Sequence, residues 1–247
     1  YDEACTISIK VGPSKSIPDA LSLIPQGPLG DAVLRAGIYR YAETVADGDA
    51  ERYAGLTAIL RQELPKLNGR EAGAPVIAPD VDPLDGAIEA ISRLNRSYLL
   101  VQGPPGTGKT YTSSHAIVEL LRRGYRVGVS SLSHKAINNL LHCVEQLAGE
   151  RGVRFSGVKK SSDEDHYLNG TGLIEDTIDN DYASNGGHQL IAGTAWLFAR
   201  DDLDRALDFL FIDEAGQVSL ANVVAMGVCA KNIVLVGDQM QLSQPIK

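Results

Sequence analysis

The segment GPPGTGKT, residues 103–110, constrains the fold of this chain more than any other stretch. It fits the pattern G-x-x-x-x-G-K-[ST], in which a glycine-rich loop joins a strand to a helix. An apolar run at residues 98–101 precedes the segment, and a run compatible with a helix follows at residues 111–123. The sequence therefore predicts a strand, a phosphate-binding loop and a helix in direct succession.

The residue types of this loop suit a magnesium-bound triphosphate. Its glycines let the loop curl until the backbone N–H groups point inward at phosphate oxygens. The helix that follows adds free N–H groups, while Lys109 can reach the β and γ phosphates and the Thr110 hydroxyl can ligate Mg²⁺. The predicted nucleotide-binding residues here are Gly103, Pro104, Pro105, Gly106, Thr107, Gly108, Lys109, Thr110 and Tyr111.

The composition indicates one large α/β domain with a smaller appendage. The chain has 247 residues, of which 44% are hydrophobic, and a formal net charge of −8. Such a charge argues against a wholly basic surface that coats nucleic acid, although it is compatible with a local basic groove. Cys5, Cys143 and Cys229 lie far apart, which favours free thiols in a reducing cytoplasm over disulfides or a zinc site.

The apolar runs and the ends of the sequence give two further expectations. The longest run without a strongly polar residue, residues 223–230, is shorter than the roughly 20 residues of a membrane span. We therefore expect a cytoplasmic protein that makes no membrane contact. The chain begins with Tyr1 rather than Met and stops at Lys247 just after a motif, so we expect a piece of a longer protein.

Residues 1–80 are predicted to be an N-terminal connector, and residues 81–247 the main domain. Proline, glycine and alanine dominate the chain before this boundary, as is typical of a linker. Alternating apolar residues indicate one strand in the connector, and helical periodicity indicates a pair of helices. The strand is predicted at residues 6–11 and the helices at residues 34–45 and 53–64.

Strands and helices alternate in the main domain, which predicts an α/β fold with a mostly parallel sheet and helices on both faces. The polar stretch at residues 159–187 is rich in glycine and asparagine, so we expect an exposed excursion with solvated charges. The other strands are predicted at residues 125–130, 153–158, 190–193, 209–212 and 233–236, and the helices at residues 84–94, 133–147 and 218–228.

Two adjacent carboxylates, Asp213 and Glu214, follow one of the predicted strands. Open α/β sheets place their ligands at the carboxyl ends of the strands, so we expect both side chains to face the bound triphosphate. Asp213 can bind the metal, and Glu214 can orient and deprotonate the attacking water. An Asp-Glu pair after an apolar run is common, and the phosphate loop about 105 residues upstream is what favours the functional interpretation.

Two more polar groups are expected at the same edge of the sheet. Asp238 and Gln241 follow the last predicted strand, and a glutamine there can donate to the γ phosphate and accept from water.

Ser133 is a suitable N-cap, and a helix that begins with His134 and Lys135 can bind a phosphodiester backbone. A simple turn and a simple capped helix explain the same residues, so these alternatives stay open.

The order and spacing of five motifs resemble the first RecA-like domain of superfamily 1 helicases. The motifs are GPPGTGKT, SLSHKAINNLL, Gly193-Thr194, IDEAGQ and VGDQMQL, within residues 84–247. The resemblance is to the Upf-like branch, which includes the nonsense-mediated-decay RNA helicase. The motifs SHKAINNLL and AGTAWLFAR resemble those of bacterial proteins in which a RecB-type nuclease precedes the helicase. The connector of this chain is similar to the segment that joins nuclease and helicase in that group.

This resemblance implies a RecA-like P-loop NTPase fold, with ATP and Mg²⁺ as cofactors. It places Gln217 and Gln241 on the γ-phosphate side, and Ser133, His134 and Thr194 at the backbone of single-stranded DNA or RNA. The implied activity is that of an ATP-dependent helicase or translocase, which couples hydrolysis to movement along the strand. Two positions depart from the family: the adenine-reading glutamine falls near Ala87, and Gln239 replaces the usual proline.

The resemblance also implies catalytic roles and a partner. Lys109, Glu214 and Gln241 would be catalytic, with Thr110 and Asp213 as metal ligands. A second RecA-like domain, expected outside this chain, would supply arginines of the kind that raise such rates about 10³- to 10⁵-fold. We therefore expect the chain alone to bind nucleotide but hydrolyse it weakly. A P-loop ATPase switch and a nucleotide-binding scaffold without helicase activity are the rival interpretations.

Overall fold

Seven strands pair in parallel to form one sheet, in the order β1-β7-β6-β2-β5-β3-β4. This computed structural model describes residues 30–71 and 73–238. The described residues from Ala32 onward belong to one compact unit. The strands are β1 Tyr98–Gln102, β2 Val127–Ser130, β3 Gly157–Lys160, β4 Ile174–Thr177, β5 Leu190–Gly193, β6 Leu207–Ile212 and β7 Ala230–Gly237.

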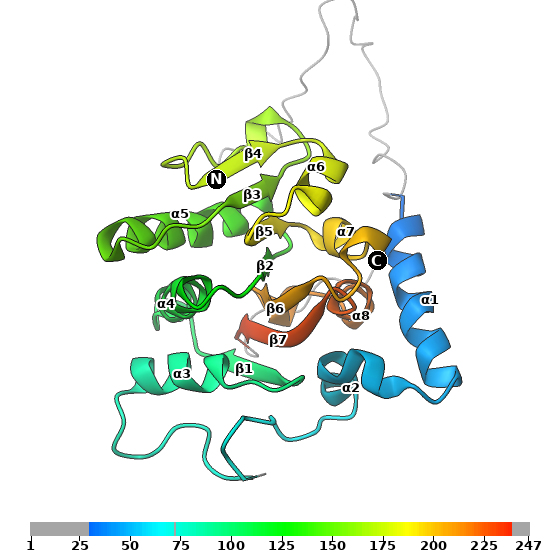
Figure 1. Ribbon diagram of the computed structural model, residues 1–247, viewed down its shortest axis with the longest axis vertical. Coiled ribbons are helices and arrows are strands. Elements are labelled where there is room, and N and C mark those ends of the chain that lie inside the picture. The colour runs from blue at the N-terminus through cyan, green and yellow to red at the C-terminus, as the bar shows by residue number, and fades with distance from the viewer. Residues whose placement is uncertain (1–29, 72, 239–247) are drawn as a thin grey trace, which may run out of the picture. The chain divides into compact units, whose positions relative to one another are not determined.

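Helices cover both faces of this sheet (Figure 1). Helices α3, α4 and α5 pack on one face, while α1, α2, α6, α7 and α8 contribute to a second core on the other. The α-helices are α1 Ala32–Ala46, α2 Ala54–Leu60, α3 Pro83–Ser92, α4 Lys109–Arg122, α5 His134–Arg151, α6 Asn180–Asn185, α7 Ala195–Phe198 and α8 Leu220–Gly227. The 3-10 turns are η1 Ala50–Tyr53, η2 Glu164–His166, η3 Asp201–Leu203 and η4 Ala215–Gln217.

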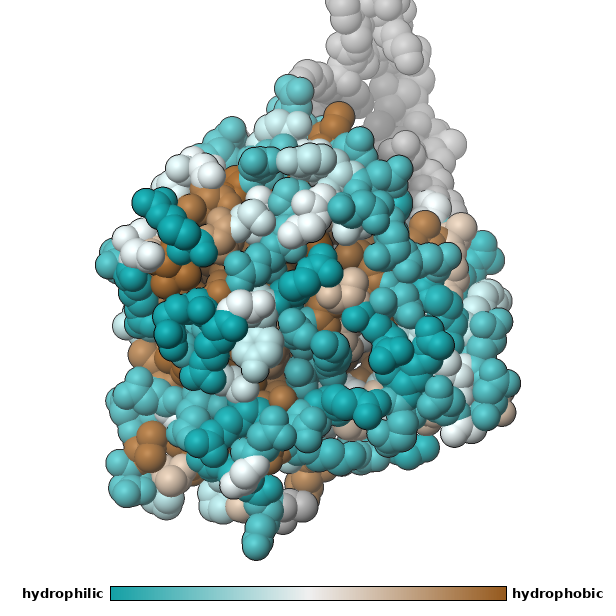
Figure 2. All heavy atoms as spheres, in the orientation of Figure 1, coloured by the Kyte–Doolittle hydropathy of each residue, from teal (hydrophilic) through white to brown (hydrophobic). Residues whose placement is uncertain are grey.

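The central strands are apolar on both sides because helices bury both faces of the sheet there. In β6, Phe209 and Phe211 point into the core under α3, α4 and α5, while Leu210 and Ile212 point into the opposite core. Hydrophilic residues cover much of the surface shown in Figure 2, with smaller apolar areas between them. None of the helices in the described part of the chain is long and apolar enough to cross a membrane. The predicted α/β class, parallel sheet and two-sided helical cover are confirmed.

The predicted pair of helices in the connector is also confirmed, as α1 and α2. Leu34 of α1 and Leu56 of α2 are buried in the same core as α8 and β7. These helices therefore share a core with the sheet rather than standing apart as an appendage. The boundary near residue 80 stays a prediction, and the strand expected at residues 6–11 lies outside the described residues.

One strand lies further along the chain than predicted. Residues 153–158 were expected to be extended, but β3 runs from Gly157 to Lys160. Gly152 ends α5 in the left-handed region with φ of 66°, and the Val153 N–H donates to the Ala148 carbonyl at 2.9 Å. Val153 thus belongs to the C-terminal cap of α5, a local geometry that alternating hydrophobicity does not reveal.

The expectation of an exposed excursion at residues 159–187 holds for more than half of its residues, which are exposed, but it missed the regular structure and the buried positions within the segment. It begins within β3 and contains β4 and α6. Lys159, Leu168 and Ile174 are buried. Asp163 and His166 do remain substantially exposed, with side-chain exposures of 56% and 46%.

Two carboxylates explain how so polar a segment is held. Glu145 of α5, itself only 2% exposed, accepts the N–H groups of Thr171, Leu173 and Ile174 at 2.8, 3.1 and 3.1 Å. Asp176 of β4 accepts the N–H groups of the two residues 168 and 169 at 2.8 and 3.0 Å. Charged acceptors satisfy the backbone here where no regular ladder does.

Replacing Glu145 with alanine should destabilise the fold by about 3 kcal/mol, because three N–H groups lose their buried acceptor. Glu145→Gln keeps one acceptor oxygen and should cost less. Urea unfolding followed by circular dichroism measures both. Glu150→Ala, at an exposed position one turn further along α5, is the control and should change stability by less than about 0.5 kcal/mol. Equal losses for Glu145→Ala and Glu150→Ala would contradict the anchoring role.

Candidate nucleotide site

The phosphate loop leaves β1 at the edge where the parallel strands end. The Gly103 N–H donates to the Gly237 carbonyl at 3.2 Å, which ties the loop to the end of β7. Gly106 and Gly108 have φ of 80° and 85°, a region that favours glycine. A Cβ on Gly103 would lie 2.4 Å from the Thr107 hydroxyl oxygen, so glycine is also required there by space.

Lys109 stands at the first position of α4 with its ammonium group turned back over the loop. Its Nζ donates to the carbonyl oxygens of Gly103 and Pro104 at 2.5 and 2.9 Å. The Thr107 hydroxyl donates to the same Pro104 carbonyl at 2.7 Å. A phosphate oxygen is a charged acceptor and would bind this ammonium more strongly than neutral carbonyls do. The side chain is therefore already positioned beside the backbone N–H groups that would hold a phosphate.

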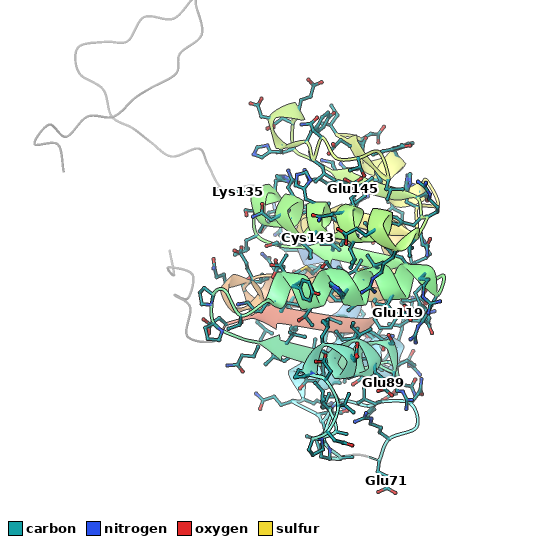
Figure 3. All side chains as sticks on the ribbon, turned by 90° about the vertical axis from the view of Figure 1, so that its left-hand side faces the viewer. Glu71, Glu89, Glu119, Lys135, Cys143 and Glu145 are labelled. Carbon is teal, nitrogen blue, oxygen red and sulfur yellow. The ribbon has the colours of Figure 1, made fainter. Side chains whose placement is uncertain are left out.

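A cavity of about 550 Å³ opens beside the phosphate loop, between α4 and α5. This volume falls in the range of roughly 300–1,000 Å³ that is usual for small-molecule sites. Figure 3 shows Cys143, which also lines the cavity, on the side of α5 that faces α4. The predicted nucleotide-binding residues that line it are Gly106, Gly108, Lys109, Thr110 and Tyr111.

The two predicted carboxylates lie at the same edge of the sheet, at the end of β6. The Asp213 N–H donates to the Ser130 carbonyl at 2.8 Å and so extends the pairing of β6 with β2 by one bond. Burial raises the pKa of the Asp213 carboxyl above its usual range, and the charge of Glu214 adds to this. The Glu214 N–H, 2.9 Å from Asp213 Oδ1, and the charge of Lys109 both oppose the rise in pKa.

The register of the strands brings the phosphate loop and the carboxylates to the same edge of the sheet. Strand β7 lies between β1 and β6, with Gln102 opposite Gly237 and Leu235 opposite Ile212. The three strands therefore end at one edge. Asp213 and Glu214 do not line the cavity between α4 and α5, whereas Lys109 does.

Glu214 adopts a backbone conformation that is unusual for its residue type. Its φ is 53°, in the left-handed region, which costs a non-glycine residue roughly 1–2 kcal/mol. The Ser131 hydroxyl donates to Glu214 Oε2 at 3.4 Å. Ser131 directly follows β2 and carries no signal in the sequence beyond that position, so its contact with Glu214 was not predicted.

Gln217 lies on the short turn η4 that follows Glu214. Its N–H donates to the Glu214 carbonyl at 2.9 Å. A Cβ on Gly216 would come within 2.8 Å of the Asp238 carbonyl oxygen, so this turn packs tightly against the end of β7. Gln217 is thus placed at the same edge as the carboxylates, whereas Gln241 lies outside the described residues.

The predicted nucleic-acid residues follow β2 and β5, which are neighbours with Ser130 opposite Gly193. The Ser133 hydroxyl accepts the Ala136 N–H at 3.1 Å and caps α5, as predicted. Thr194 precedes α7, and its hydroxyl makes no capping hydrogen bond. The structure therefore brings Ser133 and Thr194 to adjacent strand ends.

His134 begins α5 in a positively charged environment. Its ring lies 4.8 Å from that of His166. Burial lowers the pKa of His134 to about 4, and the charges of Lys159, His166 and Lys160 contribute to the shift. The imidazole is therefore neutral at neutral pH, and its buried Nδ1 has no hydrogen-bond partner among the described residues.

Thr110 and Asp213 offer the oxygen donors that Mg²⁺ prefers. Burial disfavours the ionised form of Asp213, and a bound cation would favour that form again. The donor chemistry and the burial of this carboxylate thus fit a divalent metal held next to a phosphate.

The sequence is similar to that of several DNA replication ATP-dependent helicase/nucleases. It is 30% identical over 169 residues to DNA2 of Saccharomyces cerevisiae, which covers 64% of this chain and 11% of that protein. It is 28% identical over 181 residues to DNA2 of Gallus gallus, which covers 70% of this chain and 18% of that protein. Each alignment thus spans less than a fifth of the relative's length.

Among solved structures, the chain is similar to arterivirus nonstructural protein 10, a helicase determined in complex with DNA. The TM-score is 0.37 at 16% sequence identity, over 65% of this chain and 31% of that chain.

A family model described as an AAA domain matches residues 85–246. The match begins within α3 and includes the phosphate loop, both carboxylates and β7. Parallel strands, a phosphate loop on β1 and carboxylates at the end of β6 also agree with the predicted RecA-like P-loop NTPase fold. Since the model covers well over half of the sequence, the chain belongs to the AAA domain family.

Proposed function

We propose that this chain is the ATP-binding motor domain of a superfamily 1 helicase or translocase, which couples hydrolysis of Mg-ATP to movement on single-stranded nucleic acid. The observation that carries the proposal is the convergence of Lys109, Asp213 and Glu214 at one edge of the sheet. The predicted strand-binding residues lie at neighbouring strand ends of that edge. Similarity to helicase/nucleases supports the same conclusion.

The phosphate loop would bind the triphosphate through backbone N–H groups and the Lys109 ammonium. Binding exchanges the carbonyl partners of this ammonium, at Gly103 and Pro104, for charged phosphate oxygens. Thr110 and Asp213 would hold Mg²⁺, which supplies positive charge against the charge that develops on the phosphates. Fixing these groups in advance is how most phosphoryl-transfer sites accelerate their reaction.

Glu214 would orient the attacking water and accept its proton. Its carboxylate is held by the Ser131 hydroxyl and by a strained backbone that the packing of η4 against β7 maintains. Ser131 is two residues from Ser133, the first of the predicted strand-binding residues. A shift of this segment when nucleic acid binds would therefore reach the water-activating carboxylate directly.

The chain would work as part of a larger protein. We propose a second RecA-like domain that completes the ATP site, a RecB-type nuclease domain before the connector, and a cytoplasmic location. Support for these partners comes from the helicase/nuclease names of the similar proteins and from the motifs SHKAINNLL and AGTAWLFAR. The free thiols of Cys143 and Cys229 are compatible with a reducing compartment.

Lys109→Ala should weaken nucleotide binding roughly 10- to 150-fold, because a charge-assisted hydrogen bond contributes about 1.5–3 kcal/mol. Titration of the chain with a fluorescent ATP analogue and Mg²⁺ measures this affinity. Lys231→Ala serves as the control, because Lys231 lies at the start of β7 and pairs with Asp208 of β6. The nucleotide affinity of this variant should match that of the wild type. Unchanged binding by Lys109→Ala would remove the basis for the phosphate site.

Glu214→Gln should preserve nucleotide affinity within about twofold while slowing hydrolysis roughly 10²- to 10⁴-fold, the usual contribution of a general base. The glutamine keeps the size of the side chain and an oxygen that can accept from Ser131. Phosphate release in the full-length parent protein measures the rate. Glu89→Gln, on α3 and away from the site, should hydrolyse ATP at the wild-type rate, and an equally active Glu214→Gln would refute the assignment.

A helicase motor should hydrolyse ATP faster when single-stranded nucleic acid is bound. Single-stranded DNA or RNA should strongly stimulate ATP hydrolysis by the full-length parent, whereas the 247-residue chain alone should turn ATP over slowly if the proposed second RecA-like domain supplies the arginines of the site. Steady-state phosphate release with and without oligonucleotide tests both expectations. Absence of stimulation in the parent would favour a P-loop ATPase switch instead.

A further inference from the structure

The end of β3 lies beside the predicted strand-binding residues. Strand β5 lies between β2 and β3, so the ends of three neighbouring strands stand in a row. Lys159 is opposite Ala192, which sets Lys160 next to Gly193 and close to Thr194. A Cβ on Gly193 would lie 3.5 Å from Lys160 Cβ, so the two positions face the same side of the sheet.

The two adjacent lysines at this strand end have different surroundings. Lys159 is completely buried, and its Nζ donates to the Ser161 hydroxyl at 2.6 Å and to the His166 carbonyl. Its ammonium is thus taken up in holding the turn after β3. Lys160 is only partly buried, and its Nζ donates to the Ser161 carbonyl at 3.0 Å, a neutral acceptor.

Within the described part of the chain, the charged groups around Lys160 are a cation and a carboxylate that forms no ion pair with it. Burial lowers the pKa of its ammonium, the charge of Arg200 lowers it further, and only Asp179 opposes this. Arg200 is already paired with Asp181 and Asp202 at 2.5 and 2.7 Å. Among the residues that the structure describes, Lys160 forms no ion pair with a carboxylate. An anion is therefore the partner that this ammonium lacks.

We propose that Lys160 is a further phosphodiester contact, which extends the strand-binding face of Ser133, His134 and Thr194 to a third strand of the sheet. This inference rests on the proposed function. Neighbouring strands lie about 4.8 Å apart, so the ends of β2 and β3 are separated by about 10 Å. That distance spans more than one phosphate along a nucleic-acid strand.

The chemistry of the face fits a backbone rather than bases. Hydroxyl groups, a neutral imidazole and an ammonium are donors suited to phosphate oxygens, and such contacts fix position without reading sequence. In the acidic run near Lys160, the Asp163 carboxylate already has partners, His166 Nδ1 at 2.6 Å and the Ser162 hydroxyl at 3.3 Å. Lys160 would therefore act as a sequence-independent contact.

Fluorescence anisotropy with labelled oligo(dT) and oligo(U), at several salt concentrations, tests the inference on the 247-residue chain. Lys160→Ala should weaken binding several-fold at low salt and reduce the slope of log K against log salt by about 0.7, the value for one lost phosphate contact on a single strand. Lys160→Arg should retain both. Lys160→Gln keeps most of the aliphatic stem and separates loss of charge from loss of packing. Lys66→Ala, at an exposed lysine paired with Glu63, is the control.

The outcomes separate this inference from the proposed function. A reduced slope for Lys160→Ala and Lys160→Gln, with wild-type behaviour of Lys160→Arg and Lys66→Ala, supports the assignment. Wild-type affinity and slope in Lys160→Gln, while the unmodified chain binds, overturn the Lys160 contact alone. If the unmodified chain binds neither oligonucleotide at any salt concentration, the nucleic-acid role of the whole face fails.

Discussion

Parallel pairing in register is the constraint on which the rest of this structure depends. Ser130 lies opposite both Gly193 and Ile212, and Gln102 lies opposite Gly237. Every chain segment that leaves these strands therefore starts from the same edge. A shift of one strand by a single residue would turn its apolar side chains to the other face, so the two buried cores fix the register and with it the site.

Burial at this edge determines how the charged groups behave. Asp213 is largely buried, and burial raises the pKa of its carboxyl. The charge of Lys109 lowers that pKa, and such an interaction is stronger in a buried site than in water. The same argument applies at the other end of the edge to His134, which is kept neutral by burial and by neighbouring cations. An acidic chain of net charge −8 can thus carry cations that lower the pKa of a neighbouring histidine, because net charge describes only the average field.

Local chemistry is what the sequence predicted well. The loop at residues 103–110 needs glycine at fixed positions, and the N-cap of α5 and the apolar runs of the strands are likewise properties of consecutive residues. The α/β class, the helical pair of the connector and the common edge of the site followed from them. The predicted start of β3 was too early, which shows the limit of prediction from local hydrophobicity. The Val153 N–H donates to the Ala148 carbonyl and closes the C-terminal cap of α5, a contact that hydrophobicity does not encode.

Contacts between distant residues were not predictable in this way. The segment after β3 looks solvated by composition, yet the fold holds it through Glu145, which lies more than 25 positions away from the N–H groups that it accepts. Burying the ammonium of Lys159 costs free energy that the Ser161 hydroxyl and a backbone carbonyl must offset. These partners lie only two and seven positions away, but the burial that makes them necessary comes from the packing of β3 between β5 and β4. The same holds for Ser131 and Glu214, since only the adjacency of β2 and β6 brings that hydroxyl to the carboxylate.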